Sequence, residues 1–246
     1  MNLLVCISKT PDTTARIAFK DDFTKFDEGG IQFIMNPFDE FYSLVRAIEL
    51  KEKFGGTVTV LNVGEPANDI VIRKALAIGA DKAVRINTAP TSAFSVAKQI
   101  AEYAKDKNFD IVFFGKETID YNGGEVAGMV AAMMDLPFVN LASSLEVDGA
   151  IGKLNRDIEG GVEKVEVGIP FIVSTAKGMA EQRIPNMRGI MMAKRKPLEV
   201  VEPVDTVDNI EIVKYELPKE KSGVKLVDAD NIDELVRLLH EEAKVI

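Results

Sequence analysis

Over residues 3–134, short apolar runs alternate regularly with longer segments of helical character, and this alternation constrains the fold more than any other feature of the sequence. Four runs predict strands: residues 3–7, 57–63, 82–86 and 110–114, of which residues 3–7 carry no polar alternation and predict a central, buried strand. Four segments predict helices between or after them: residues 36–54, 67–78, 92–107 and 126–134. Because the connections are only a few residues long, the pattern predicts a Rossmann-like α/β fold, in which a parallel sheet carries helices on both faces.

The first of these helices has a well-defined start and end. Asn36 is expected to cap it, and Pro37 suits the first helical position. Asp39 and Glu40 would then lie in the first turn, where the positive end of the helix dipole favours acids. The paired glycines at residues 55–56 predict its end.

The loop between the strand at 110–114 and the helix at 126–134 is the candidate binding site. It contains Gly123 and Gly124, which let a backbone approach a ligand closely, and the free N–H groups of a helix start favour an anion. In open α/β sheets, nucleotides bind in such a crevice. The loop matches neither GxGxxG nor the P-loop, so a turn that needs glycine for steric reasons alone stays an alternative. Asp120 could act as a base or bind a ribose or a metal, although an Asp at such a loop more often caps the next helix.

The pattern changes after residue 136, where strand-like runs replace helices. The predicted strands cover residues 142–147, 151–158, 162–167 and 171–175, with a tight hairpin turn at Gly160 and Gly161. An earlier inserted hairpin is expected within residues 16–35, turning at residues 27–30. We therefore expect a β-hairpin region in addition to the parallel sheet.

The C-terminal part of the chain is basic and then extended. Residues 177–197 hold six basic residues against one acid, together with four methionines. Residues 198–229 predict an extended arm, and residues 232–243 a short amphipathic helix. We expect a single α/β nucleotide-binding domain over residues 1–197, with a C-terminal arm and short helix over residues 198–246 that pack on a partner subunit.

Charge and residue usage exclude several classes of function. A formal net charge of −9 argues against a general nucleic-acid binder or a membrane-surface protein, and no apolar run approaches the length of a membrane span. The only histidine, His240, is expected to be a solvated residue of the C-terminal helix, so no Ser/His/Asp or Cys/His nucleophile system can be assembled around a core histidine. The single cysteine, Cys6, excludes an internal disulfide. No carboxylate cluster has metal-ligand spacing. With no secretory leader expected, we predict a cytoplasmic protein with a binding or carrier role.

Five segments, in order, resemble the β subunit of electron-transfer flavoproteins. The segments are residues 35–40 (MNPFDE), 75–81 (ALAIGAD), 115–120 (GKETID), 156–163 with 170–173 (RDIEGGVE and PFIV), and 183–191 with 193–199 (RIPNMRGIM and AKRKPLE). Each segment is weak evidence by itself, but five in order at fitting distances are highly specific. The resemblance runs from residue 1 to about residue 240.

The resemblance implies a heterodimer whose α subunit contributes most of an FAD site, while the β subunit holds a second adenine nucleotide. This nucleotide is usually a structural AMP; in electron-bifurcating members it is a second FAD, beside which NADH docks. The resemblance places the nucleotide on the following residues: Ile7, Asn36, Pro37, Phe38, Asp39, Val63, Gly115, Lys116, Glu117, Thr118, Ile119, Asp120, Tyr121, Asn122, Gly123, Gly124, Glu125 and Val126. The loop at residues 120–126 (DYNGGEV) matches neither the N-Q-T of AMP-binding members nor the D-G-D-T-A-Q-V-G-P of bifurcating members, and Glu125 stands where the family usually has a neutral Gln. The choice between AMP and FAD therefore stays open.

The resemblance also implies two protein contacts. Residues 183–198 correspond to a recognition loop for partner flavoprotein dehydrogenases, in which Met187 would replace the usual Leu anchor. The partner-recognition residues are then Arg183, Met187, Arg188, Ile190 and Met191. Asp157 lies where the family often has a Glu that contacts the flavin domain across the subunit interface.

The sequence thus predicts an electron carrier that transfers electrons from dehydrogenases, such as the acyl-CoA dehydrogenases of fatty-acid oxidation, through FAD to an acceptor. One alternative is an enzyme subunit: a bifurcating member that oxidises NADH. Another is a stand-alone nucleotide-binding protein of the stress-protein or ATP-pyrophosphatase type. That alternative has little support, because the sequence lacks the SGGxDS and GxxGx9G(S/T) loops.

Overall fold

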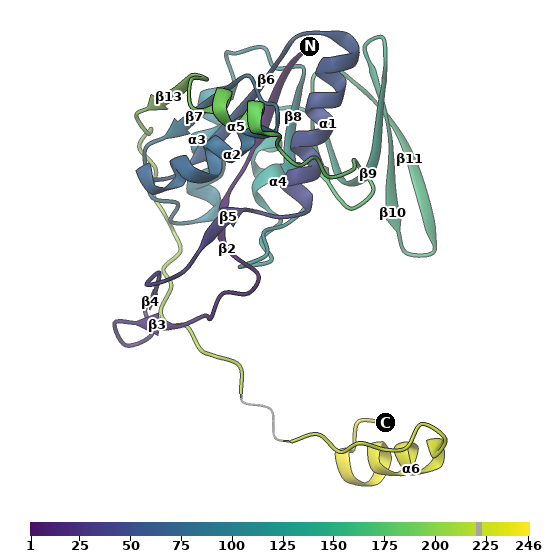
Figure 1. The fold of residues 1–246 in the computed structure, drawn as a ribbon. Coiled ribbons are helices and arrows are strands. Elements are labelled where there is room, and N and C mark those ends of the chain that lie inside the picture. The colour runs from purple at the N-terminus through teal and green to yellow at the C-terminus, as the bar shows by residue number, and fades with distance from the viewer. Residues whose placement is uncertain (220–222) are drawn as a thin grey trace. The chain divides into compact units, whose positions relative to one another are not determined.

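The computed structural model describes residues 1–219 and 223–246, and it divides into two compact units (Figure 1). One unit comprises residues 1–17 and 27–212 and contains the large sheet; the other comprises residues 18–26 and 213–246. The arm expected over residues 198–246 includes residues 220–222, which lie outside the described residues.

Within the described residues, one nine-stranded sheet forms the centre of the first unit. Its strands are β1 (Asn2–Cys6), β6 (Thr57–Val63), β7 (Lys82–Ile86), β8 (Ile111–Gly115), β9 (Phe138–Asp148), β10 (Ile151–Ile158), β11 (Gly161–Gly168), β12 (Phe171–Thr175) and β13 (Leu198–Val201). Their order is β11-β10-β9-β12-β8-β1-β6-β7-β13. In this sheet order, every neighbouring pair from β9 through β12, β8, β1, β6 and β7 to β13 is parallel. Strands β9, β10 and β11 form an antiparallel meander at the other end. The predicted α/β fold with its hairpin region is therefore confirmed.

Helices cover both faces of this sheet (Figure 1). They are α1 (Asp39–Phe54), α2 (Asp69–Ile78, preceded by the 3-10 turn η1, Pro66–Asn68), α3 (Ala93–Ala104), α4 (Val126–Met134) and the short α5 (Met187–Ala193). Alternate residues of β1 show the two faces: Leu3 and Val5 pack in a cluster with α1 and α2, whereas Leu4 and Cys6 pack in a cluster with α3 and α4. A strand buried on both faces is expected to be mainly apolar, and residues 3–6 of β1 and the residue that follows it, Ile7, are apolar throughout.

The inserted segment before α1 differs in detail from the prediction. In the first unit, β2 (Lys9–Pro11) pairs with β5 (Phe33–Met35) in antiparallel fashion. In the second unit, β3 (Phe19–Lys20) pairs with β4 (Lys25–Phe26), so the hairpin turns at residues 21–24 and not at residues 27–30. Residues 21–23 take positive φ angles, which Asp tolerates better than most residues.

The start of α1 also corrects the prediction. Asn36 does not cap the helix and Pro37 is not its first residue; the N-cap position belongs to Phe38, with φ 65°. The helix ends at Phe54 as expected, and Gly55 follows with φ 74°. Asp39 and Glu40 do lie in its first turn.

The basic segment and the arm contain regular structure that the sequence did not predict. Residues 187–193 of the expected loop form α5, and residues 198–201 of the expected arm form β13, which pairs in parallel with β7. In the second unit, the predicted C-terminal helix is confirmed as α6 (Ile232–Arg237), which continues as the π-helical η2 (Leu238–Ala243).

Candidate functional site

The candidate nucleotide site lies where the order of the strands reverses. The chain passes from β1 to β6 and β7 on one side, and then returns to β8 and β12 on the other side of β1. Ile7 directly follows β1, Val63 ends β6 and Gly115 ends β8. The carboxyl ends of the strands flanking a reversal form the crevice in which open α/β sheets bind ligands. The structure therefore places these three residues at the edge where a ligand is expected.

Asn36 ties the segment before α1 to the loop after β8. Its Nδ2 donates to the carbonyl of Glu117 at 2.9 Å, and its Oδ1 accepts from the N–H of Ile119 at 3.1 Å. The side chain is fully buried. Because both ends of the amide are used, Asn36 fixes the position of the loop at residues 115–126 instead of capping α1.

The loop closes on itself through the backbone. The N–H of Asn122 donates to the carbonyl of Thr118 at 2.9 Å. The N–H of Thr118 donates to the carbonyl of Gly123 at 3.1 Å. Within the described part of the chain, the N–H groups of Gly123 and Gly124 donate no hydrogen bond. Such free donors in a turn favour an anion.

Glycine is sterically required at one of the two paired positions. A Cβ on Gly124 would lie 2.8 Å from the carbonyl oxygen of Lys116, closer than real side chains come to backbone. A Cβ on Gly123 would meet nothing closer than 3.5 Å, at a Glu125 carboxylate oxygen. The close approach at Gly124 packs one arm of the loop against the other.

Helix α4 starts at the end of this loop. Glu125 occupies its N-cap position, and its side chain accepts no capping hydrogen bond. The first N–H groups of a helix have no partner within the helix and carry partial positive charge. The end of the loop at Glu125 and Val126 is therefore suited to accept a phosphate through the backbone, whatever the side chain of Glu125.

A buried acid lies behind the loop. The carboxylate of Glu40 accepts the N–H of Ser8 at 2.7 Å and the Ser8 hydroxyl at 2.6 Å. Burial raises the pKa of Glu40 to about 8, against the lowering effect of the two Ser8 hydrogen bonds, and Asp120 adds a further rise. Burial likewise raises the pKa of Asp39 to about 6, although Lys116 opposes this shift. At neutral pH, Glu40 is thus largely protonated and carries little charge.

These features test whether the residues fit an adenine nucleotide. The loop offers free backbone N–H groups, a close approach at Gly124 and the start of α4, and Lys116 adds a cation that is shared with Glu117 at 3.0 Å. The acids at Asp39, Asp120 and Glu125 oppose a phosphate. The backbone donors fit a phosphate, and a neutral Glu40 reduces the opposing charge.

The remaining predicted residues lie at the rim of the same edge. Phe38 has φ 65° and is 51% exposed, and Tyr121 is 65% exposed. Pro37 is half-buried. A non-glycine residue with positive φ is uncommon and is often found at functional sites. The site thus has a loop part, after β8, and a β1–β6 part that contains Ile7 and Val63.

The β1–β6 part depends on residues that the sequence analysis did not single out. Asn62 is buried; its Nδ2 donates to the Ile7 carbonyl at 2.8 Å, and its Oδ1 accepts from Asn68 at 2.9 Å. A Cβ on Gly64 would lie 1.9 Å from the Asn68 Nδ2 atom. An Asn within a strand expected to lie inside the sheet was the available signal, since a buried amide needs partners.

Arg85 holds the turn after β6. It is 4% exposed, forms an ion pair with Asp69 at 2.8 Å, and donates to the Gly64 carbonyl at 3.1 Å. An Arg within a buried strand was again the signal. Burying a guanidinium requires paired acceptors, and this pairing fixes the backbone that follows Val63.

A second candidate surface lies on α5, away from the nucleotide loop. Met187 is 75% exposed, Met191 67% and Ile190 43%. Ile184, which the sequence analysis did not single out, is 92% exposed and precedes the helix. An array of exposed apolar side chains on one segment indicates a protein contact.

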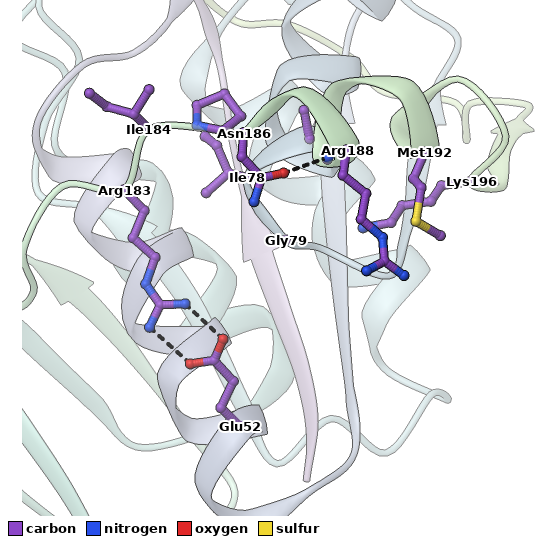
Figure 2. A pocket seen from close by; sticks show the side chains of 12 residues that line it. Glu52, Ile78, Gly79, Arg183, Ile184, Asn186, Arg188, Met192 and Lys196 are labelled. Carbon is purple, nitrogen blue, oxygen red and sulfur yellow. Dashed lines mark hydrogen bonds and ion pairs between the residues drawn. The ribbon is translucent and has the colours of Figure 1, made fainter.

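A pocket of about 560 Å³ lies beside this surface (Figure 2). Its lining residues come from the ends of α1 and α2 and from residues 183–196; they are Glu52, Ala77, Ile78, Gly79, Arg183, Ile184, Pro185, Asn186, Arg188, Gly189, Met192 and Lys196. We call it the α5 pocket. The loop at residues 115–126 does not line it, so the α5 pocket is distinct from the candidate nucleotide site.

The structure places Asp157 on β10, opposite Val162 of β11. The carboxylate is exposed and accepts a long hydrogen bond of 3.5 Å from the Ser143 hydroxyl. It is therefore accessible to another protein.

No group of three or more His, Cys, Asp or Glu side chains that could hold a metal ion occurs among the described residues. No helix in the described ranges is long and apolar enough to cross a membrane.

Comparison with known proteins gives a family match over most of the chain. The model of the electron transfer flavoprotein domain matches residues 24–206. The electron transfer flavoprotein subunit beta of Bacillus subtilis (strain 168) is 37% identical over 261 aligned positions that cover 100% of both chains. The subunit of the same name from Syntrophomonas wolfei is 33% identical over 235 positions, covering 94% of this chain and 92% of that one. The human subunit is 30% identical over 256 positions, covering 100% and 99%.

Proposed function

The chain belongs to the electron transfer flavoprotein family as a β subunit, and we propose that it works in a heterodimer with an α subunit. In this role it carries electrons, through FAD bound mainly on the α subunit, from flavoprotein dehydrogenases such as acyl-CoA dehydrogenases to a downstream acceptor. The β subunit itself binds AMP as a structural group. We place this carrier in the cytoplasm, without membrane insertion or nucleic-acid binding.

The two hydrogen bonds of the Asn36 side chain, to Glu117 and Ile119, are the observation that carries the nucleotide part of the proposal. They join the segment before α1 to the loop after β8, at the point where the order of the strands reverses. Adenine nucleotides bind at such points because free backbone donors and a helix start meet there. The proposed AMP contacts are the residues assigned above, from Ile7 and Asn36 through residues 115–126, and these residues bind the nucleotide without acting on it.

A second FAD is the alternative occupant of the same site. It would make the heterodimer an electron-bifurcating flavoprotein with an NADH site, and the subunit part of an enzyme. The loop at residues 120–126 matches neither the AMP-binding nor the bifurcating pattern of the family, so it does not decide between the two classes. A stand-alone nucleotide-binding protein is not supported, because the relatives share the whole length of this chain.

The nucleotide content of the assembled heterodimer tests this proposal. After co-expression with its α subunit and denaturation of the purified complex, we expect one FAD and one AMP per heterodimer, quantified by chromatography of the released nucleotides. Two FAD per heterodimer would move the assignment to a bifurcating complex. Only the flavin of the α subunit would show that the loop at residues 115–126 is a turn without a ligand.

We further propose that residues 183–198 dock the partner dehydrogenase, with α5 at their centre. Met187 serves as an apolar anchor, joined by the still more exposed Ile184, while Arg183, Arg188, Ile190 and Met191 surround them. Asp157, on the hairpin formed by β10 and β11, is proposed to contact the flavin-binding domain of the α subunit.

Truncating these anchors should slow electron transfer. Ile184→Ala and Met187→Ala are each expected to raise the KM of the donor dehydrogenase for the heterodimer about tenfold, because a few apolar anchors dominate binding at protein interfaces. Ile151→Ala removes an exposed apolar side chain from β10, outside this segment, and should leave KM unchanged. The FAD content of each purified variant, measured after denaturation, shows whether the heterodimer has assembled normally. Loss of FAD in the Met187 variant would instead give this segment a structural role.

A further inference from the structure

We propose that the α5 pocket receives an acidic segment of the partner dehydrogenase, in which an apolar side chain enters the pocket and a neighbouring carboxylate binds Arg188. This inference rests on the docking role proposed above and goes beyond it: the β subunit would not only insert its own anchors but also accept a residue of its partner.

The walls of the pocket are fixed by contacts within the chain. Arg183 forms two hydrogen bonds to the carboxylate of Glu52, at 2.8 and 2.9 Å (Figure 2). Arg73 donates to the carbonyls of Ala193 and Lys196, at 2.8 and 2.7 Å, and so holds the end of α5. A pocket that exists before binding requires less ordering when its occupant arrives.

The floor of the pocket depends on a close helix contact. A Cβ on Gly189 would lie 2.5 Å from the carbonyl oxygen of Ala77, so only glycine lets α5 approach α2 this closely. Asn186 caps α5 by accepting the N–H of Gly189 at 2.8 Å. Both features keep α5 in place beside the pocket.

The cations around the pocket differ in what they bind. Lys196 donates to the carbonyls of Leu76 and Ala80, at 2.9 and 2.5 Å. Lys51 donates to the carbonyl of Gly79 at 3.0 Å. The negative end of α2 is therefore already neutralised. Arg188 makes no hydrogen bond or ion pair with any residue in the described ranges, and its side chain extends along the Gly79 side of the pocket (Figure 2).

Charge complementarity indicates an anionic occupant. The lining contains three cations, Arg183, Arg188 and Lys196, against one carboxylate, Glu52, so its formal charge is +2 on a chain of net charge −9. Because Glu52 pairs with Arg183, the guanidinium of Arg188 remains available to a carboxylate from outside. Arginine binds carboxylates in a two-pronged geometry that gives both strength and orientation.

The apolar part of the lining indicates a protein segment and not a small anion. Ile184 and Met192, 92% and 50% exposed, lie at the pocket, and Met187 and Met191 extend the apolar surface along α5. A phosphate or a small acid would leave this surface in water. A protein surface with an apolar side chain beside an Asp or Glu would cover both parts.

A pair of matched charge reversals tests the inference. Arg188→Glu and Arg195→Glu change the net charge equally on the same segment, and both positions are exposed, but only Arg188 lines the pocket. With the assembled heterodimer and an acyl-CoA dehydrogenase of the same organism, we expect Arg188→Glu to raise KM about tenfold and leave kcat nearly unchanged, since a close charge contact is lost. Arg195→Glu should raise KM less than about threefold, through long-range attraction alone. Arg188→Gln should give an intermediate value.

Each other outcome has a definite meaning. Equal effects of the two reversals would assign the effect to net charge and overturn the pocket proposal. No effect of Arg188→Glu, together with slow transfer in Ile184→Ala or Met187→Ala, would also overturn it while the docking role stands. No effect in any of these variants would overturn both.

Inorganic phosphate, exchanged for chloride at constant ionic strength, provides a second probe. For a protein occupant, we expect phosphate to change the wild-type KM by less than about twofold. A large phosphate-specific rise that disappears in Arg188→Gln, without an effect of Arg188→Glu in chloride, would show a small-anion site and overturn the proposal.

Discussion

Gly124→Ala is expected to remove the bound nucleotide almost completely, to less than about a tenth of the wild-type content per heterodimer. The added methyl carbon would lie 2.8 Å from the carbonyl oxygen of Lys116. That oxygen has little freedom to move, because the N–H of Lys116 donates to Thr175 of β12 at 3.0 Å. The loop must therefore open at Gly124, which displaces the N–H groups that are proposed to bind the phosphate. Gly124→Val should have the same effect to a greater extent.

Gly123→Ala is the matched control for this prediction. Its methyl carbon would come no closer than 3.5 Å to any atom, and the nearest atom belongs to the flexible side chain of Glu125. Nucleotide content should stay close to that of the wild type, measured by chromatography after denaturation of the heterodimer. The FAD content should be unchanged in both variants, because FAD is proposed to lie mainly on the α subunit. Full nucleotide retention in Gly124→Ala would remove this loop from the site.

The strands and helices of the sheet could be predicted from the sequence because local pattern and tertiary environment agree there. Residues 151–158, 171–175 and 126–134 were predicted with the bounds that the structure shows. Each is either a short apolar or alternating run or an Ala- and Met-rich segment next to glycine or proline. In such segments, burial favours the same conformation as local propensity.

Helix α5 could not be predicted because its formation depends on a distant contact. It has seven residues, and its third residue, Gly189, is a poor helix former. The structure requires glycine there, since any side chain would collide with the Ala77 carbonyl of α2. Packing on α2 thus overrides a weak local preference, and no sequence pattern within residues 183–198 reports it.

Asn36 shows the same limitation at the candidate site. An Asn followed by Pro and two acids is typical of a helix start, and the sequence pattern therefore favoured a cap. In the structure, its amide instead bonds to Glu117 and Ile119, more than eighty positions away. The segments that form the site could be predicted from their places after the strands, but the hydrogen bonds that join them could not.

Glu40→Gln is expected to make the protein more stable than the wild type at alkaline pH, with a difference that grows as the pH rises. Burial raises the pKa of Glu40 from 4.5 in the unfolded chain to about 8 in the folded protein. Between these values the folded state binds one proton more than the unfolded state. The free energy of unfolding of the wild type must then fall as the pH rises from 4.5 to about 8, by at most about 1.4 kcal/mol per pH unit.

Glutamine reproduces the protonated acid at this position. Its amide oxygen can accept the Ser8 N–H, and its NH₂ group can donate to the Ser8 hydroxyl, which occupy the two carboxylate oxygens of Glu40 in the structure. The variant does not ionise, so its stability should lack this part of the pH dependence. Asp39, whose pKa is raised to about 6, contributes a slope of the same sign below about pH 6 in both proteins.

Denaturant unfolding of wild type and Glu40→Gln heterodimers between about pH 5.5 and 8.5 measures this difference. Glu52→Gln is the control: Arg183 lowers the pKa of that exposed carboxylate, so its contribution to stability is lost only on acidification below the usual range of a Glu. The difference between wild type and Glu52→Gln should therefore be flat across the same interval. A flat difference for Glu40→Gln as well would mean that Glu40 is ionised at neutral pH, and that a phosphate bound at the neighbouring loop faces its full negative charge.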